Sequence, residues 1–276
     1  MGSLRETKER INSVKGTLKI TTAMKFVASS KLHKAQNSIE AMIPYQQALS
    51  QVFQALGSGK YGLEGKQGGK VAIVAMASNT SLCGTFNATI LKAALEQVEK
   101  YPEADIYAIG RRMAEPLAKA GHPSVGDFTA LMAKPEYGQA AALADRLRAA
   151  FQDGAYSKVI LVYNHFASFV SQQVRVESFL PFEVPVQEKD RLEDEFIVEP
   201  GVEEIADRLL PEVLRLKIYT TLLDSSAAEN AARTIAMQTA SDNAQDLLSE
   251  LTLEYNKARQ QKITNEILDL IGGSQQ

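Results

Sequence analysis

The sequence contains no tryptophan and a single cysteine, Cys83, among its 276 residues. One cysteine excludes an intramolecular disulfide, and it excludes a zinc site built from several thiolates. It also suits a reducing compartment. Packing and hydrogen bonding, rather than disulfides, must therefore stabilise the fold.

Long apolar runs and a strong charge of one sign are also missing. No uninterrupted apolar run approaches the roughly 20 residues of a membrane span, and the N-terminal residues lack the apolar core of a secretory signal. Thirty basic residues against 33 acidic ones give a net charge of -3, which argues against wholesale binding to nucleic acid or membranes. We expect no lipid-spanning segment, no leader and no nucleic-acid partner.

Proline is absent from residues 3–43, where Gly16 is the one glycine. Steps that alternate three and four residues meet nine apolar residues, two threonines and one lysine: Leu4, Thr7, Ile11, Val14, Leu18, Thr21, Lys25, Ala28, Leu32, Ala35, Ile39 and Met42. A repeat averaging 3.5 residues is a heptad seam. It predicts a helix on the order of 60 Å long that needs a partner helix, with Pro44 as its first break.

The C-terminal quarter of the chain mirrors this pattern. Residues 202–271 contain no glycine and one proline, Pro211, where we expect a kink or a restart of the helix. Apolar residues recur at helical spacing, and seven alanines lie between Ala227 and Ala244. Because small side chains let helix axes approach closely, we expect tight packing there. Gly272 and Gly273 end the predicted helix.

The middle of the chain alternates between short β-rich runs and helical ones. Strands are predicted at 71–77, 105–109, 158–163 and 172–179, with helices at 89–100, 111–120 and 139–151. Alternating strands and helices indicate an α/β sandwich with a largely parallel sheet.

The sequence contains no complete motif for binding a nucleotide or a metal ion. Residues 57–62 satisfy G-x-G-x-x-G literally, but a predicted helix precedes them and more glycines follow, which favours a linker. Each nearby Gly-Lys pair lacks the Ser or Thr of a phosphate-binding loop. His33, His122 and His165 lie far apart and give no metal-ligand spacing. We therefore expect no nucleotide, metal or other cofactor.

Cys83 follows a predicted strand, where a strand-to-helix turn could present a nucleophile. Such a role needs a nearby base, which sequence spacing cannot supply. A small buried side chain is the favoured interpretation.

Three other classes of protein remain as alternatives. An α/β enzyme with helical arms for dimerisation would need a polar pocket around Cys83 or His165. A homodimeric zipper protein would need two identical seams to align. The basic residues at positions 5–34 could also suggest a DNA-reading helix, but they flank the seam itself, which favours solvent or an acidic protein partner.

The two terminal helices are expected to pair with each other, antiparallel, because the central domain returns the chain to its starting side. The predicted fold is α/β: a long antiparallel coiled coil of N- and C-terminal helices plus a central α/β Rossmann-like domain. We place the N-terminal helix at 1–56, a Gly-rich linker at 57–69, the central domain at 70–200 and the C-terminal helix at 201–276.

Four stretches carry a family resemblance: residues 19–32 (KITTAMKFVASSKL), 82–87 (LCGTFN), 229–244 (ENAARTIAMQTASDNA) and 255–267 (YNKARQQKITNEI). The last begins the signature Ile-Thr-x-Glu-x-x-Asp, present as Ile263, Thr264, Glu266 and Asp269. Over nearly its whole length the chain resembles the gamma subunits of F-type (proton-translocating) ATP synthases. Where that family usually continues with Gly-Ala, this chain has Gly273-Ser274.

The resemblance implies a non-catalytic subunit, the central rotor stalk. In the family the coiled coil lies inside a hexamer of alpha and beta subunits, and the foot joins the epsilon subunit and the c-subunit ring. Torque transmitted between ring and hexamer couples proton flow to ATP synthesis or hydrolysis. The implied location is the cytoplasmic face of a bacterial cell membrane, as a peripheral part of the complex.

The resemblance also implies contact residues. Met24 matches a position that faces the beta lever region and Arg233, and Arg259 and Gln260 match a pair that hydrogen-bonds an acidic loop of beta. Thr264 and Glu266 belong to the same surface. In the foot, implied contacts with epsilon or the c ring fall at four positions: Cys83, Gly84, Ile197 and Glu199.

Overall fold

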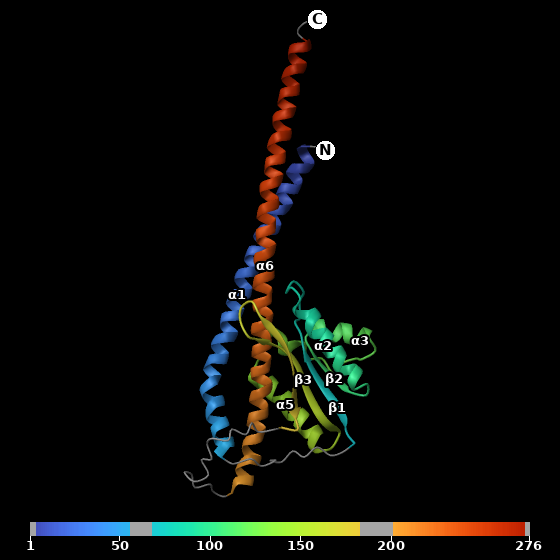
Figure 1. Ribbon diagram of the computed structural model, residues 1–276, viewed down its shortest axis with the longest axis vertical. Coiled ribbons are helices and arrows are strands. Elements are labelled where there is room, and N and C mark those ends of the chain that lie inside the picture. The colour runs from blue at the N-terminus through green and yellow to red at the C-terminus, as the bar shows by residue number, and fades with distance from the viewer. Residues whose placement is uncertain (1–3, 56–67, 183–200, 274–276) are drawn as a thin grey trace. The chain divides into compact units, whose positions relative to one another are not determined.

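The computed structural model describes residues 4–55, 68–182 and 201–273 (Figure 1). The chain divides into two compact units. The first comprises residues 1–28 and 233–276, and the second comprises residues 29–232. Two long helices, α1 (Leu4–Ala55) and α6 (Val202–Gly273), contribute to both units.

The predicted seam of α1 is confirmed position by position. Six of its twelve residues are buried, the other six are half-buried, and none is exposed. Most residues between these positions are exposed. The seam is buried because a repeat of 3.5 residues keeps one stripe of the helix turned towards a partner.

In the first unit that partner is α6, and the pairing is antiparallel. The Thr21 and Ser241 hydroxyls share a buried hydrogen bond of 2.8 Å, and Lys25 Nζ donates to Gln238 Oε1 at 2.9 Å. Residue numbers rise on one helix as they fall on the other, as an antiparallel pair requires. Two residues 220 positions apart in sequence therefore share one hydrogen bond inside the coiled coil.

Neither proline interrupts its helix, so the predicted break at Pro44 and the restart at Pro211 are wrong. Both prolines lie inside continuous helices. A proline within a helix removes the hydrogen bond to the carbonyl four residues earlier. Those carbonyls belong to Glu40 and Asp207, which are exposed positions where solvent can satisfy them.

The second unit contains a four-stranded sheet in the order β2-β1-β3-β4. β1 (Lys70–Met76) pairs in parallel with β2 (Asp105–Ile109) and with β3 (Tyr156–Phe166). β4 (Gln172–Leu180) pairs with β3 in the antiparallel sense. The sheet is therefore largely parallel, as the sequence predicts.

Helices cover both faces of this sheet. On one face, α2 (Phe86–Lys100) and α3 (Arg111–Lys119) pack against a set of side chains that includes Ile73 and Ala75 of β1. On the other, α5 (Tyr137–Gln152) and the portion of α6 around Leu210–Leu222 pack against Val74 and Met76. Alternate residues of β1 enter different cores, which is why the strand reads as an unbroken apolar run.

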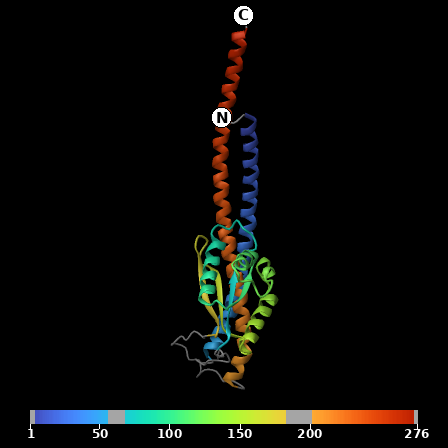
Figure 2. The same cartoon turned by 90° about the vertical axis from the view of Figure 1, so that its right-hand side faces the viewer.

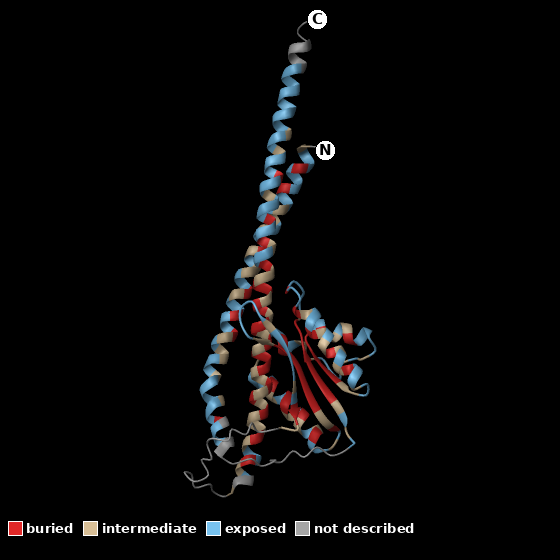
Figure 3. Cartoon of the chain, in the orientation of Figure 1, coloured by how far each residue is buried: buried red, intermediate tan, exposed pale blue. Residues whose placement is uncertain are grey.

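The sequence did not predict the short helix α4 (Thr129–Ala133), which adds Leu131 and Met132 to the second of these cores. Figure 3 shows how burial is concentrated in the sheet and along α6. From Leu209 to Met237 no residue of α6 is exposed. This long helix therefore serves as core in the second unit as well as seam in the first.

In the second unit α1 and α6 meet through small residues. Leu32 and Ala35 of α1 cluster with Ala227 and Ala231 of α6. The predicted close packing at the alanine-rich stretch is confirmed, because both alanines of α6 are fully buried.

Candidate functional site

The last described turns of α6 are an uncovered helix. Every residue from Arg259 to Leu268 is exposed, including the apolar residues Ile263, Ile267 and Leu268. Four residues singled out from the sequence lie in this stretch: Arg259, Gln260, Thr264 and Glu266. An exposed helix that still carries large apolar side chains is suited to contact with another protein.

The four residues share one side of the helix. At 100° per residue, Glu266, Arg259, Gln260 and Thr264 fall within an arc of about 160°, together with Ile263 and Ile267. Within the helix, Thr264 Oγ1 donates to the Gln260 carbonyl at 3.0 Å, and Lys262 Nζ lies 3.6 Å from Glu266 Oε1. The Arg259 side chain makes no hydrogen bond or ion pair with any residue that the structure describes. Its guanidinium is available to a carboxylate of a partner.

Met24 and Arg233 lie in the first unit at different depths. Met24 is half-buried and Arg233 is buried. Beside Met24, Phe26 is 65% exposed and Lys25 Nζ lies 5.1 Å from its ring centroid. This part of α1 therefore presents an aromatic ring on its outer side, whereas Lys25 belongs to the seam and donates to Gln238 of α6. The roles of Met24 and Arg233 in contacting a partner stay predictions.

Cys83 belongs to the loop between β1 and α2, and its side chain is buried. Its side chain packs with Phe86 and with Ala228 of α6, and Asn87 Nδ2 donates to Cys83 Sγ at 3.1 Å. The neighbouring Gly84 is exposed, with a φ of 59°. The favoured interpretation of Cys83 as a small core residue is confirmed. A partner at this loop would touch Gly84, and Cys83 would support the loop from inside.

Ile197 and Glu199, the other two predicted foot contacts, lie outside the described residues, as do residues 57–62 with their literal G-x-G-x-x-G match. Of the histidines, His33 is exposed on α1. Within the described ranges, no cluster of three or more His, Cys, Asp or Glu side chains could hold a metal ion.

Sequence reasoning missed a pair that joins β3 to α6. His165 Nδ1 lies 2.7 Å from Asp224 Oδ2, and the Phe166 amide donates to Asp224 Oδ1 at 2.9 Å. The partners are 59 residues apart in sequence, so no local spacing could have indicated them. Asp224 fixes the end of β3 onto α6.

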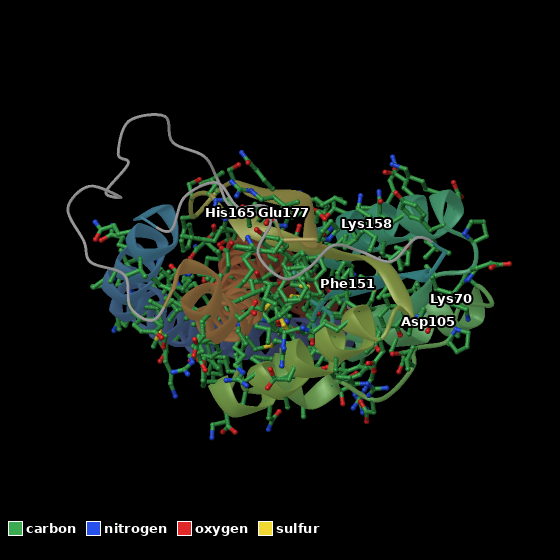
Figure 4. The ribbon with its side chains drawn as sticks, turned by 90° about the horizontal axis from the view of Figure 1, so that it is seen from below. Lys70, Asp105, Phe151, Lys158, His165 and Glu177 are labelled. Atoms are coloured by element: carbon green, nitrogen blue, oxygen red, sulfur yellow. The ribbon has the colours of Figure 1, made fainter. Side chains whose placement is uncertain are left out.

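A second group of contacts fixes β4 and β3 to α6. Lys217 Nζ donates to Glu177 Oε2 at 2.6 Å, and the Tyr163 hydroxyl donates to Glu177 Oε1 at 2.9 Å. Burial acts to raise the pKa of Glu177, but the hydrogen bond and charge of Lys217 outweigh it and hold this pKa below its usual value. Burial raises the pKa of Tyr163, and the Glu177 charge adds to that effect. Figure 4 labels Glu177 and His165 on the sheet.

We expect Lys217→Met to lower the free energy of unfolding by about 1 kcal/mol at neutral pH, because Glu177 then loses its cation. The lowered pKa of Glu177 stabilises the fold above the unfolded value of about 4.3, and this stabilisation is lost as the pH falls through the folded pKa. The difference between variant and parent should therefore shrink below about pH 4 in urea unfolding curves. Lys158→Met, at a half-buried lysine of β3, is the control. If Lys217→Met lowered the free energy of unfolding by the same amount at every pH, the stabilisation could not be assigned to the Lys217–Glu177 pair.

A third group of hydrogen bonds and ion pairs joins α5 to α6. Arg215 Nε donates to both carboxylate oxygens of Asp145 at 3.0 Å, and Glu212 accepts from Arg215 Nη1. Tyr137 donates to Glu212 at 3.0 Å and packs edge-on against Tyr219. Burial, together with Glu212, raises the pKa of Tyr137 to about 12, so this hydroxyl stays a donor at neutral pH. These contacts hold α6 on the second unit.

No helix within the described residues combines the length and the hydropathy that crossing a bilayer requires. The first unit is an antiparallel pair of terminal helices and the second contains a small α/β domain. The chain is therefore an α/β protein with a coiled coil formed by its two terminal helices.

Comparison with known proteins identifies the family. A family model described as ATP synthase matches residues 3–275. The ATP synthase gamma chain of Phocaeicola vulgatus is 47% identical over 99% of both chains, and that of Flavobacterium johnsoniae is 39% identical over 100% of this chain and 99% of the relative. The chain belongs to the ATP synthase gamma chain family.

Solved structures agree on the fold. A chain from the Euglena gracilis mitochondrial ATP synthase structure that includes F1 and the c-ring has a TM-score of 0.67 at 17% identity, covering 99% of this chain and 93% of its own length. A chain from the Tetrahymena thermophila mitochondrial ATP synthase central stalk and c-ring has a TM-score of 0.57 at 23% identity, covering 80% of this chain and 99% of its own length. The predicted fold class and family resemblance are both confirmed.

Proposed function

We propose that this chain is the central rotor stalk of an F-type ATP synthase and carries torque between a membrane c ring and a catalytic hexamer of alpha and beta subunits. Membership of the gamma chain family supports this role. The observation that carries it is the bare end of α6, where the family-matched residues from Arg259 to Glu266 are all exposed and share one side of the helix.

The two units suit two mechanical tasks. In the first unit, the continuous antiparallel seam with its buried Thr21–Ser241 hydrogen bond resists sliding of one helix along the other. In the second unit, the hydrogen bonds of Asp224, Lys217 and Arg215 connect α6 to the sheet and to α5. A force applied to the α/β domain is thereby transferred to α6. Such a rigid element can couple two distant sites.

In this proposal the chain performs no bond chemistry, and ATP is made or hydrolysed on the hexamer. Alpha and beta surround the coiled coil, while epsilon and the c ring bind the second unit, with Gly84 at one of the contacts. Bacterial relatives support a place on the cytoplasmic face of a bacterial cell membrane, as a peripheral subunit.

The decisive variant is Arg259→Ala in the assembled complex. We expect ATP turnover and ATP-driven proton pumping to fall by about tenfold, the equivalent of about 1.4 kcal/mol, because a guanidinium that binds a carboxylate of beta is lost. Arg259→Lys should recover part of the activity, since it keeps the charge without the fork of donors. The melting temperature of the isolated chain should not change, because Arg259 is exposed.

Lys257→Ala is the matched control. Lys257 is an exposed cation on the same helix, about 160° around the axis from Arg259. It should leave turnover and pumping near the parent level. Normal pumping and hydrolysis in Arg259→Ala would contradict the proposed contact.

A further inference from the structure

Three consecutive residues join the end of β3 to the rest of the second unit. Asn164 Nδ2 donates to the Phe86 carbonyl at 3.4 Å, and His165 Nδ1 lies 2.7 Å from Asp224 Oδ2. The Phe166 amide donates to the other carboxylate oxygen of Asp224 at 2.9 Å. These bonds hold the backbone at Phe166 and so restrict where its ring can lie.

The half-buried Phe166 side chain packs against two hydrophobic clusters. The first consists of Leu32, Ala35, Ala227 and Ala231, and the second consists of Cys83, Phe86 and Ala228. Among the described residues that border these clusters, Ile39 packs against the first and Ala232 against the second, whereas Phe166 packs against both. The ring therefore connects α1 with the loop between β1 and α2, across the alanine-rich surface of α6.

Small residues of α6 make room for this ring. The three alanines of α6 in the two clusters are fully buried, and side chains of this size let neighbouring groups approach the helix closely. The loop after β1 and the turn after β3 lie at the same end of the sheet (Figure 2), because the two strands are parallel neighbours. Phe166 supplies at this end the large apolar area that the alanines lack.

Three of the four stretches that carry the family resemblance contribute residues to these clusters. Leu32 ends the stretch 19–32, Cys83 and Phe86 belong to 82–87, and Ala231 belongs to 229–244. Phe166 belongs to none of the four stretches. The side chain that borders both clusters is therefore one that no motif indicated.

We propose that Phe166 is a positioning residue of the stalk, which transmits force between the loop at residues 82–87 and the paired helices α1 and α6. The inference rests on the proposed function, in which Gly84 of this loop contacts another subunit. A force applied at Gly84 reaches the helices through the side chains packed against the loop. A packed ring transmits displacement because protein interiors have low compressibility, and a cavity in its place lets the loop and α1 shift independently.

The number of protons pumped per ATP hydrolysed, measured in the assembled ATP synthase, tests this inference. We expect Phe166→Ala to lower this ratio by at least about threefold, within the range by which substitutions between distant sites change their coupling. A purely structural role would lower the amount of active complex, so that pumping and hydrolysis fall together and their ratio stays the same. An unchanged ratio in Phe166→Ala would overturn the inference.

Phe166→Leu keeps part of the apolar volume and is the second variant. Its ratio should lie between those of Phe166→Ala and the parent, in the order of side-chain volume. If Phe166→Ala does not assemble, Phe166→Leu decides the question, and a ratio equal to that of the parent would then overturn the inference.

Phe169→Ala is the matched control. Phe169 lies in the turn between β3 and β4 and is 43% exposed, so the same truncation there opens no cavity between elements. It should keep the ratio of the parent. A fall as large as that in Phe166→Ala would remove the assignment to Phe166.

Hydrogen–deuterium exchange of the isolated chain gives an independent check. Amides in residues 32–35 and in residues 83–87 should both exchange faster in Phe166→Leu, by about tenfold, because both segments pack against the ring. Amides of β2 should not change. Faster exchange in only one of the two segments would contradict a connection through Phe166.

Failure of the proposed function is distinguishable from failure of this inference. A parent complex that hydrolyses ATP without pumping protons would contradict the rotor role, and the inference would fall with it. An active parent complex with the same ratio in the Phe166 variants would contradict the inference alone.

Discussion

Gly110→Ala is expected to unfold much of the second unit. Gly110 lies between β2 and α3 with a φ of 91°, and a Cβ atom built on it would lie 2.0 Å from the Ala77 carbonyl oxygen. That oxygen belongs to the backbone at the end of β1, where Ala77 N donates to Ile109 O and Arg112 N donates to Ser78 O. The strands cannot move apart without breaking these bonds. We expect a loss of more than about 4 kcal/mol in the free energy of unfolding.

Gly121→Ala is the control, because it introduces the same backbone strain as Gly110→Ala without a steric clash. Gly121 has a φ of 90°, but a Cβ atom there would meet nothing within 4 Å. It should therefore cost only about 1 kcal/mol. Urea unfolding followed by tyrosine fluorescence suits both variants, since the chain has no tryptophan and eight of its nine tyrosines lie in residues 29–232. Equal losses in the two variants would show that the close approach at Ala77 is unimportant.

Ala231→Leu is expected to force α1 and α6 apart in the second unit. Ala231 is fully buried against Leu32 and Ala35 of α1, where three added carbon atoms have no space. Overpacking of this kind should cost about 3 kcal/mol. In the assembled complex, ATP-driven proton pumping should fall further than ATP hydrolysis, because a loosened pair of helices transmits less torque.

Ala41→Leu is the control for this variant. Ala41 lies on the exposed side of α1, so the same added side chain should change the free energy of unfolding by less than about 0.5 kcal/mol and leave pumping intact. If Ala231→Leu and Ala41→Leu gave the same free energy of unfolding and the same proton pumping, the alanine contact would not determine how closely the two helices pack.

The twelve seam positions of α1 show what local pattern can predict. All twelve are buried or half-buried, because the heptad repeat depends only on spacing along one helix. The strands were placed within two or three residues for a similar reason: β1 and β2 are apolar runs buried on both faces. The predictions made from Pro44 and Pro211 were wrong for the opposite reason. Each proline costs the helix one local hydrogen bond, but packing along the rest of the helix outweighs that loss.

The candidate contact residues divide in the same way. Arg259 and its neighbours were found by resemblance, and their common side of the helix follows from helical geometry. Cys83 was correctly placed in the core from its solitary occurrence. Pairs such as His165 with Asp224, or Glu177 with Lys217, could not be predicted, because their partners are 40 or more residues apart and neither member belongs to a motif.

By itself the sequence determined the two long helices, their mutual need for a partner, the central α/β order and the family. Periodicity and motif are properties of neighbouring residues, so they survive without coordinates. Tertiary structure alone decided which side chains of α6 serve as core and which stay bare, and how Asp224, Lys217 and Arg215 fasten that helix. Each of these depends on residues that folding brings together from distant parts of the chain, and no pattern along the chain encodes such distances.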